Sequence, residues 1–171
     1  NIIRSTDKGS SFDNVTSGIT TTLEGVTFGN NTFVGVGFNG NIVRSTDNGT
    51  SWDNATSPTA NLLYGVGFGN NTFVAVGDSG NIVRSTDNGT TWDNATSPTS
   101  NVLEVVNFGN NTFVAVGDSG NIVRSTDNGT SWDNATTDNS TVNNLKKVTF
   151  GNNTFVAVGD SGNIVRSTDN G

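Results

Sequence analysis

The sequence predicts an all-β fold assembled from tandem copies of one unit of about 40 residues. The segment NIVRSTDNG recurs with little change, at spacings of 40, 40, 40 and 42 residues, starting at Asn1, Asn41, Asn81, Asn121 and Asn163. No stretch has the 3.6-residue apolar period of a helix. Short runs rich in Val, Ile and Phe are instead separated by Gly, Asn and Ser. Four short antiparallel strands in each repeat are typical of a β-propeller blade.

The repeat at 61–100 illustrates the four expected strands. Strand one lies in NLLYGVGFGN and ends at an Asn-Asn turn, strand two is TFVAVG, strand three is NIVRSTD and strand four is TWDNATS, with turns at DSG and NG. In the preceding repeat we expect strands near 22–28, 32–37, 41–46 and 51–55. A parallel β-helix is the structural alternative, but it would not need a hairpin turn after every strand.

The chain is expected to form one repeat domain, 1–171, of about four blades. It divides into a part-blade at 1–14, repeats near 21–54, 61–94 and 101–134, and a part-blade at 144–171. Strand three occurs five times and the other strands four times. Strands three and four at 1–14 can therefore complete a blade begun by strands one and two at 144–160. The copy of strand three at 163–169 is then redundant. We expect self-association, as a homodimer of eight blades, with a longer repeat chain as the alternative.

The turn before strand four has the repeated pattern Ser-x-Asp-x-Gly-x-Ser/Thr-Trp. Its central residues are Asp47, Gly49 and Trp52, then Asp87, Gly89 and Trp92, then Asp127, Gly129 and Trp132; the first copy has Asp7, Gly9 and Phe12, and the last has Asp169. This pattern resembles the Asp-box, or BNR repeat, of sialidase-like and sortilin-type propellers. The wider unit FVAVGDSGNIVRSTDNGTSW resembles blades of photosystem-II assembly-factor-type propellers. The resemblance covers essentially the whole chain and implies a propeller, but it leaves the function open.

The residues of this motif favour a structural role. Asp47 can accept hydrogen bonds from turn amides, Gly49 can adopt a positive φ, and Trp52 can bury its ring between blades if its N–H finds a partner. Phe12 is expected to fill a similar space in a terminal blade. The alternative is a Ca²⁺ loop, but the EF-hand spacing with its distant Glu is missing. We therefore predict no metal site and no cofactor.

Composition excludes several classes of function. The net charge is −7, and five of the eight basic residues are the arginine repeated in strand three, so nucleic acid is not an expected partner. The chain has no Cys and no His, and no apolar run is long enough to span a membrane. The cellular compartment is not indicated.

An enzymatic activity is not predicted, although sialidases share the Asp-box. The resemblance to sialidases would imply an arginine cluster and a Tyr–Glu nucleophile pair. Here each arginine occupies one equivalent position per repeat, and Tyr64 is the only tyrosine. Glu24 and Glu104, the only glutamates, lie at the repeat position of Tyr64.

The repeats differ mainly in strand one and the loop that leads into it. Repeats 41–80 and 81–120 differ at six positions, and five of these lie in that region. In a propeller, strand one lines the central channel, and the DSG turn shares its face. The candidate ligand-binding residues are therefore Tyr64, Glu104, Glu24, Lys146, Lys147, Asp78, Asp118 and Asp160. Drift at tolerant, exposed positions is the alternative interpretation.

Three hypotheses for function follow. The first is a non-enzymatic propeller that presents a protein- or peptide-binding face. The second is a carbohydrate-binding, sialidase-like propeller without activity, with a glycan as ligand. The third is an amplified or designed repeat scaffold with no natural ligand.

Overall fold

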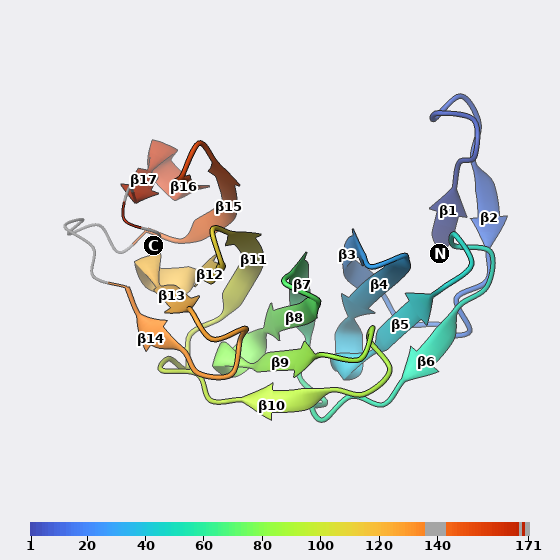
Figure 1. Cartoon of the computed structure of the whole chain (residues 1–171), viewed down its shortest axis with the longest axis horizontal. Helices are drawn as coiled ribbons and strands as arrows, with labels where there is room; N and C mark the ends of the chain where they lie inside the picture. The colour runs from blue at the N-terminus through green and yellow to red at the C-terminus, as the bar shows by residue number, and fades with distance from the viewer. Residues whose placement is uncertain (136–142, 168, 170–171) are drawn as a thin grey trace.

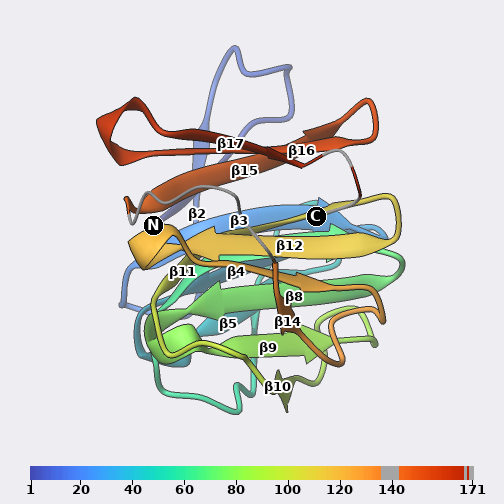
Figure 2. The same cartoon turned by 90° about the vertical axis from the view of Figure 1, so that its left-hand side faces the viewer.

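The computed structural model describes residues 1–135, 143–167 and 169, which form five antiparallel sheets along an open arc (Figure 1). Three sheets have four strands, the N-terminal sheet has two, and the C-terminal sheet has three within the described ranges. Figure 2 shows the sheet of β15–β17 stacked on the sheet that contains β12. The first and last sheets lie at opposite ends of the arc (Figure 1).

Within each sheet, strands that are consecutive in the chain lie side by side. The N-terminal pair is β1 (Ile2–Arg4) and β2 (Asp13–Val15); the first blade is β3 (Leu23–Gly29), β4 (Thr32–Gly37), β5 (Ile42–Ser45) and β6 (Asp53–Ala55). The second blade is β7 (Leu63–Gly69), β8 (Thr72–Gly77), β9 (Ile82–Ser85) and β10 (Asp93–Ala95); the third is β11 (Leu103–Gly109), β12 (Thr112–Gly117), β13 (Ile122–Ser125) and β14 (Asp133–Asn134). The C-terminal triple is β15 (Leu145–Gly151), β16 (Thr154–Gly159) and β17 (Ile164–Ser167).

The predicted all-β class and four-stranded repeat are confirmed, with strand ends in the first blade within two residues of the expected ones. The only helical segments in the described ranges are single 3-10 turns after strand two: η1 (Phe38–Gly40), η2 (Asp78–Gly80), η3 (Asp118–Gly120) and η4 (Asp160–Gly162). In the described part of the chain, no helix is long and apolar enough to cross a membrane.

The turn residues explain why the strands end where they do. Asn70 and Asn71 have φ values of 47° and 58°. Positive φ at both central positions is the requirement of a type I′ hairpin turn, and Asn tolerates it better than most residues. At the other end of strand two, the N–H of Asp78 donates to the carbonyl of Leu62 at 2.9 Å. This bond holds the DSG turn next to the start of strand one.

Neighbouring blades pack face to face through the apolar side of each sheet. Strands two and three of the second blade supply Val74, Val76 and Ile82, which pack against Leu103, Val106, Phe113 and Trp132 of the third blade. The equivalent residues of the first and second blades form the same cluster one repeat earlier. Because side chains alternate along a strand, residues between these positions face the preceding blade, so each internal sheet is buried on both faces.

A phenylalanine of each following blade lies directly on a glycine of the blade before it. A Cβ atom added to Gly69 would lie 2.0 Å from the ring of Phe108, and one added to Gly109 would lie 2.0 Å from the ring of Phe150. The ring of Phe108 also packs at a tilt against Phe113 of its own blade, with centroids 4.7 Å apart. The missing Cβ of the glycine therefore sets how closely two blades approach.

The turn before strand four, which has the Asp-box-like pattern and is called the Asp-box turn for that resemblance, forms a closed set of hydrogen bonds. The hydroxyl of Ser45 donates to Asp47 Oδ1 and accepts from the N–H of Gly49, at 2.8 and 2.9 Å. The N–H of Ser51 donates to Asp47 Oδ1 and its hydroxyl donates to Oδ2, at 2.9 and 2.7 Å. Trp52 Nε1 donates to the carbonyl of Gly49 at 3.2 Å. Both carboxylate oxygens of Asp47 are thus used within the turn itself.

Phe12 does not fill the space of the tryptophans, contrary to expectation. It is 58% exposed, whereas Trp92 is 5% exposed. Trp92 packs near Phe73 of strand two, with ring centroids 6.5 Å apart. The N-terminal pair contains no strand two, so Phe12 lacks that neighbour.

In the single chain the strand at 163–169 is paired, so its expected redundancy in an assembled ring stays a prediction. β17 pairs with β16, with Ile164 opposite Val158 and Arg166 opposite Val156. Within the described residues, β1 pairs only with β2. A single 3-10 turn joins β16 to β17, so this pairing orders few residues, while pairing β16 with β1 of the same chain requires both ends of the arc to meet.

We predict that Gly69→Ala lowers the free energy of unfolding by about 1–3 kcal/mol, because the new methyl group overlaps the ring of Phe108. Urea denaturation measures the change. The control is the same substitution in a Phe108→Leu background, where the planar ring is absent and the cost should fall. An equal cost in both backgrounds would contradict the ring-on-glycine contact.

We predict that Asp127 stabilises the fold above about pH 4 and that this contribution is lost as the pH falls towards 2. Burial alone raises its pKa, but hydrogen bonds from Ser131, Ser125 and Thr130 outweigh that effect and lower the pKa from 3.8 to about 2. A carboxylate with a lowered folded-state pKa stabilises only while it is ionised. Asp127→Asn should therefore flatten the pH dependence of stability between pH 4 and 2. Asp133→Asn, which removes an exposed carboxylate outside the turn, is the control.

Candidate functional site

The variable residues of strand one lie on β-bulges. Pairing between β7 and β8 shifts between Leu63 and Gly65, so Tyr64 is the extra residue. The same shift leaves Glu24, Glu104 and Lys146 unpaired in the equivalent strands. A bulge bends a strand and re-aims a side chain, and bulges are frequent beside functional sites. The repeat comparison found these positions but did not indicate the bulges.

The four bulge residues form one row along the concave side of the arc. β3, β7, β11 and β15 line that side, and the fourth strands lie on the convex side (Figure 1). Neighbouring first strands approach closely: a Cβ added to Gly25 would lie 2.8 Å from the Tyr64 carbonyl oxygen, and one added to Gly65 would lie 2.9 Å from that of Glu104. The order along the row is therefore Glu24, Tyr64, Glu104 and Lys146.

The 3-10 turns bring further side chains to the start of these strands. The N–H of Asp118 donates to Val102 O, and that of Asp160 donates to Asn144 O, both at 2.9 Å. In the first blade this position is Phe38, which is exposed. The sequence could have revealed this residue, because FNG at 38–40 stands where the later repeats have DSG. We call the resulting surface the bulge face: Glu24, Tyr64, Glu104 and Lys146 together with Phe38, Asp78, Asp118 and Asp160.

An ion pair connects the third blade to the C-terminal triple within the bulge face. Lys146 Nζ lies 2.7 Å from Glu104 Oε1 and 3.8 Å from Asp118 Oδ1. The hydrogen bond to Glu104, with the charges of Glu104, Asp118 and Asp160, raises the pKa of Lys146. The lysine is therefore charged at neutral pH and neutralises only part of the surrounding acidity.

Tyr64 lies among carboxylates. Burial is the largest cause of its raised pKa, followed by the charge of Asp78, a hydrogen bond to that carboxylate, and the charges of Glu104 and Glu24. The phenol therefore stays protonated at physiological pH and acts as a hydrogen-bond donor at the centre of the row.

Lys147 is not part of this row. It follows the bulge, pairs with Val158 and is exposed. The equivalent positions of the first two blades are Gly25 and Gly65, which face the first strand of the next blade. Lys147 occupies this position at the C-terminal end of the arc.

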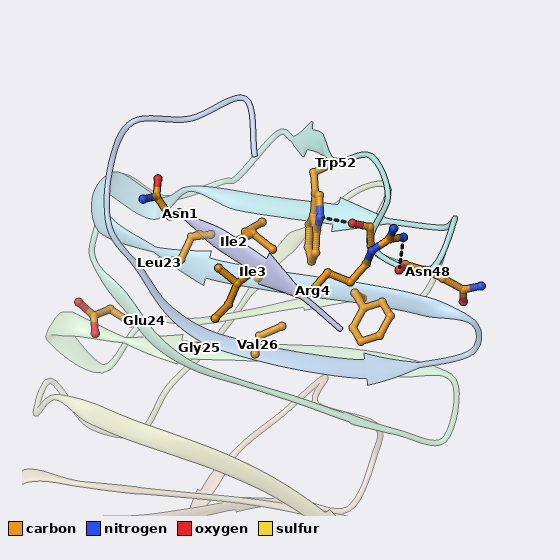
Figure 3. A pocket seen from close by; sticks show the side chains of 13 residues that line it. Asn1, Ile2, Ile3, Arg4, Leu23, Glu24, Gly25, Val26, Asn48 and Trp52 are labelled. Atoms are coloured by element: carbon orange, nitrogen blue, oxygen red, sulfur yellow. Dashed lines mark hydrogen bonds between the residues drawn. The ribbon is translucent and has the colours of Figure 1, made fainter. Parts of the chain in front are cut away.

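A pocket of about 370 Å³ lies elsewhere, between β1 and the first blade (Figure 3). It is lined mainly by apolar groups, including Ile2, Leu23, Val26 and Trp52. Arg4 crosses its edge, where its Nη1 donates to Thr50 Oγ1 at 2.5 Å and to the Asn48 carbonyl. Of the predicted binding residues, only Glu24 borders this pocket. The bulge face is therefore the better candidate for a binding site.

Comparisons with known proteins identify the fold. No protein-family model matches the sequence, and no curated protein matches it. Among solved structures, the WD40 β-propeller domain of Doa1 is similar, with a TM-score of 0.63 and 14% identity over 88% of this chain and 52% of that chain. The chain has a β-propeller fold.

Two further structures agree with this fold. YCF48 bound to a D1 peptide gives a TM-score of 0.69 and 19% identity, over 85% of this chain and 49% of that chain. The computationally designed Ika4 protein gives a TM-score of 0.72 and 14% identity, over 90% of this chain and 95% of Ika4. The resemblance to photosystem-II assembly-factor-type propellers is thus confirmed for the fold, and the chain spans about half the length of the YCF48 chain that it matches.

We predict that Tyr64 titrates above the ordinary value of 10.0 and that Asp78→Asn lowers its pKa, because the substitution removes a neighbouring negative charge. Tyr64 is the only tyrosine, so the ultraviolet absorbance of tyrosinate reports it alone. Circular dichroism at each pH shows that the chain stays folded. An unchanged midpoint in the folded Asp78→Asn variant would mean that the two groups do not interact.

Proposed function

We propose that this chain is a non-enzymatic binding propeller whose bulge face holds an extended peptide segment of a protein partner. The observation that carries the proposal is the row of bulges. The bulge position is one of the strand-one positions that differ between nearly identical repeats, and its residues lie in a row on the concave surface. Rigid strands that present variable side chains are suited to recognition.

The chemistry of the bulge face favours a basic peptide with an apolar side chain. The bulge face has five carboxylates and one lysine, and that lysine is engaged by Glu104 and Asp118. Phe38 and Tyr64 add aromatic surface at the N-terminal half of the row. A peptide that carries Lys or Arg beside a hydrophobic residue would complement both features. YCF48, which has a similar fold, is bound to a D1 peptide, and this supports a peptide as the class of ligand.

The arginines support a non-enzymatic role. Arg44 Nη1 donates to the Asn88 carbonyl at 3.2 Å, and Arg4 makes the equivalent bond to Asn48 one blade earlier. These guanidinium groups connect strand three of one blade to the Asp-box of the next. They are therefore engaged away from the bulge face and do not form a carboxylate-binding cluster there. We infer that the Asp-boxes likewise serve blade structure.

We predict that a basic, apolar-containing peptide selected from a peptide array binds the chain and that Tyr64→Ala or Glu104→Gln weakens binding at least about tenfold. Isothermal titration calorimetry measures the affinities. Asp93→Asn, an exposed carboxylate on outer strand β10, is the matched control and should bind normally.

Other outcomes distinguish the alternatives. Binding on a glycan array without peptide binding would favour the carbohydrate-binding propeller. Absence of any ligand on both arrays would favour the repeat scaffold. Turnover of a fluorogenic sialoside that is lost in the Tyr64 or Glu104 variant would overturn the non-enzymatic role.

A further inference from the structure

The two ends of the arc expose residues that are buried at the equivalent positions of the internal blades. Val26, at the N-terminal end, is 68% exposed, whereas Val66 is 9% exposed one repeat later. Ile164, at the C-terminal end, is 69% exposed, whereas Ile82 is 1% exposed. Each end is therefore one uncovered half of the same blade-to-blade interface.

The halves match at the ring-on-glycine contact. Phe28 is the repeat equivalent of Phe68 and Phe108, but it is exposed and has no glycine beneath it in the described structure. Gly151 is the equivalent of Gly69 and Gly109, but a Cβ added to it would meet no atom within 4 Å. One end thus offers a ring and the other end offers the glycine that receives it.

The pocket at the N-terminal end lies where strands one and two of a preceding blade would pack against the first blade. Leu23, Val26 and Phe33 line it, and their equivalents in the second blade pack against Val34 and Val36 of the first blade. β1 already occupies the place of strand three of a preceding blade, because Arg4 makes the same bond to the Asp-box that Arg44 makes. What the pocket lacks is therefore strands one and two.

β15 and β16 supply those strands. Val156 and Val158 of β16 are the repeat equivalents of Val34 and Val36, and Val158 is exposed at the C-terminal end. β17 has the sequence IVRS and β1 has IIRS, so β1 can replace β17 beside β16. β1 also brings β2, a fourth strand, which the described C-terminal triple does not have. Phe155 would then provide the strand-two ring that Phe12 lacks.

The charges at the two ends are complementary. Lys146 pairs with Glu104 of the preceding blade, and the bulge residue that follows in a continued row is Glu24. Lys147 adds a second positive charge at the C-terminal end. A lysine pair therefore meets a glutamate when the ends of two copies join.

We propose that two copies of this chain join end to end by exchanging strands, independently of any peptide ligand. β15 and β16 of one copy fill the pocket between β1 and β3 of the other, Phe28 lies on the Gly151 of the other copy, and β17 leaves the sheet. Three complete blades from each copy and one shared blade at each junction make eight. Twofold symmetry makes the two junctions identical and closes the ring.

Sedimentation velocity on the whole chain tests this proposal. We expect the mass of a dimer of 17.7 kDa chains. Gly151→Ala should weaken dimerisation at least about tenfold, because a methyl group at this position of the interface overlaps the phenylalanine ring. The substitution meets no atom within its own chain, so circular dichroism should show an unchanged fold.

Two further variants separate strand exchange from simple docking. The double variant Gly151→Ala/Phe28→Ala should recover part of the lost affinity, because the smaller side chain leaves room for the methyl group. Ile164→Asp should leave the dimer intact, since β17 is displaced; a weaker dimer would overturn the exchange. A 17.7 kDa monomer at all concentrations, assemblies that grow beyond two chains, or an unaltered dimer in Gly151→Ala would overturn the proposal.

Discussion

The contact between a phenylalanine ring and the glycine of the preceding blade sets the geometry of the whole array. Phe68 on Gly29, Phe108 on Gly69 and Phe150 on Gly109 repeat the same approach, and each glycine has no room for a Cβ. Van der Waals contact at such short range fixes the spacing of two sheets, because packed interiors tolerate little overlap. The valine, leucine and tryptophan clusters between blades fill the space that this spacing leaves.

Hydrogen bonds tie the outer strands to this packed interior. A carboxylate organises the Asp-box turns, and the turns of the first two complete blades also present a carbonyl to an arginine of the preceding sheet, as Asn88 does for Arg44. Asn30, in the turn between strands one and two of the first blade, connects the same two blades, because its Nδ2 donates to Oδ1 of Asn88 in the Asp-box turn of the second blade at 2.6 Å. Most residues that recur in every repeat are thus engaged in holding blades together. This explains why recurrence in this chain indicates structure more than ligand binding.

The residues free to differ are the bulge residues and their neighbours on the concave side. A bulge removes a residue from the ladder, so its side chain is not held by a cross-strand partner. Tyr64 and Glu104 can therefore replace each other without altering the pairing of Gly65 or Val105. The same freedom allows Lys146 to pair with Glu104 across two sheets. A binding surface can diverge here while the interfaces between blades stay constant.

The sequence by itself determined the repeat, the four strands, the turns and the group of variable positions. These are local features: the φ preferences of Asn70 and Asn71, the continuous β-forming run of β8 and the spacing of the Asp-box pattern all act within a few residues. Tertiary structure decided the bulge at Tyr64, the ring of Phe108 on Gly69, the exposure of Phe12 and the pairing of β17 with β16. Each of these depends on which strand lies beside another in space. Since the repeats are nearly identical, the sequence offers several equivalent partners for every strand, and only the packed arrangement selects among them.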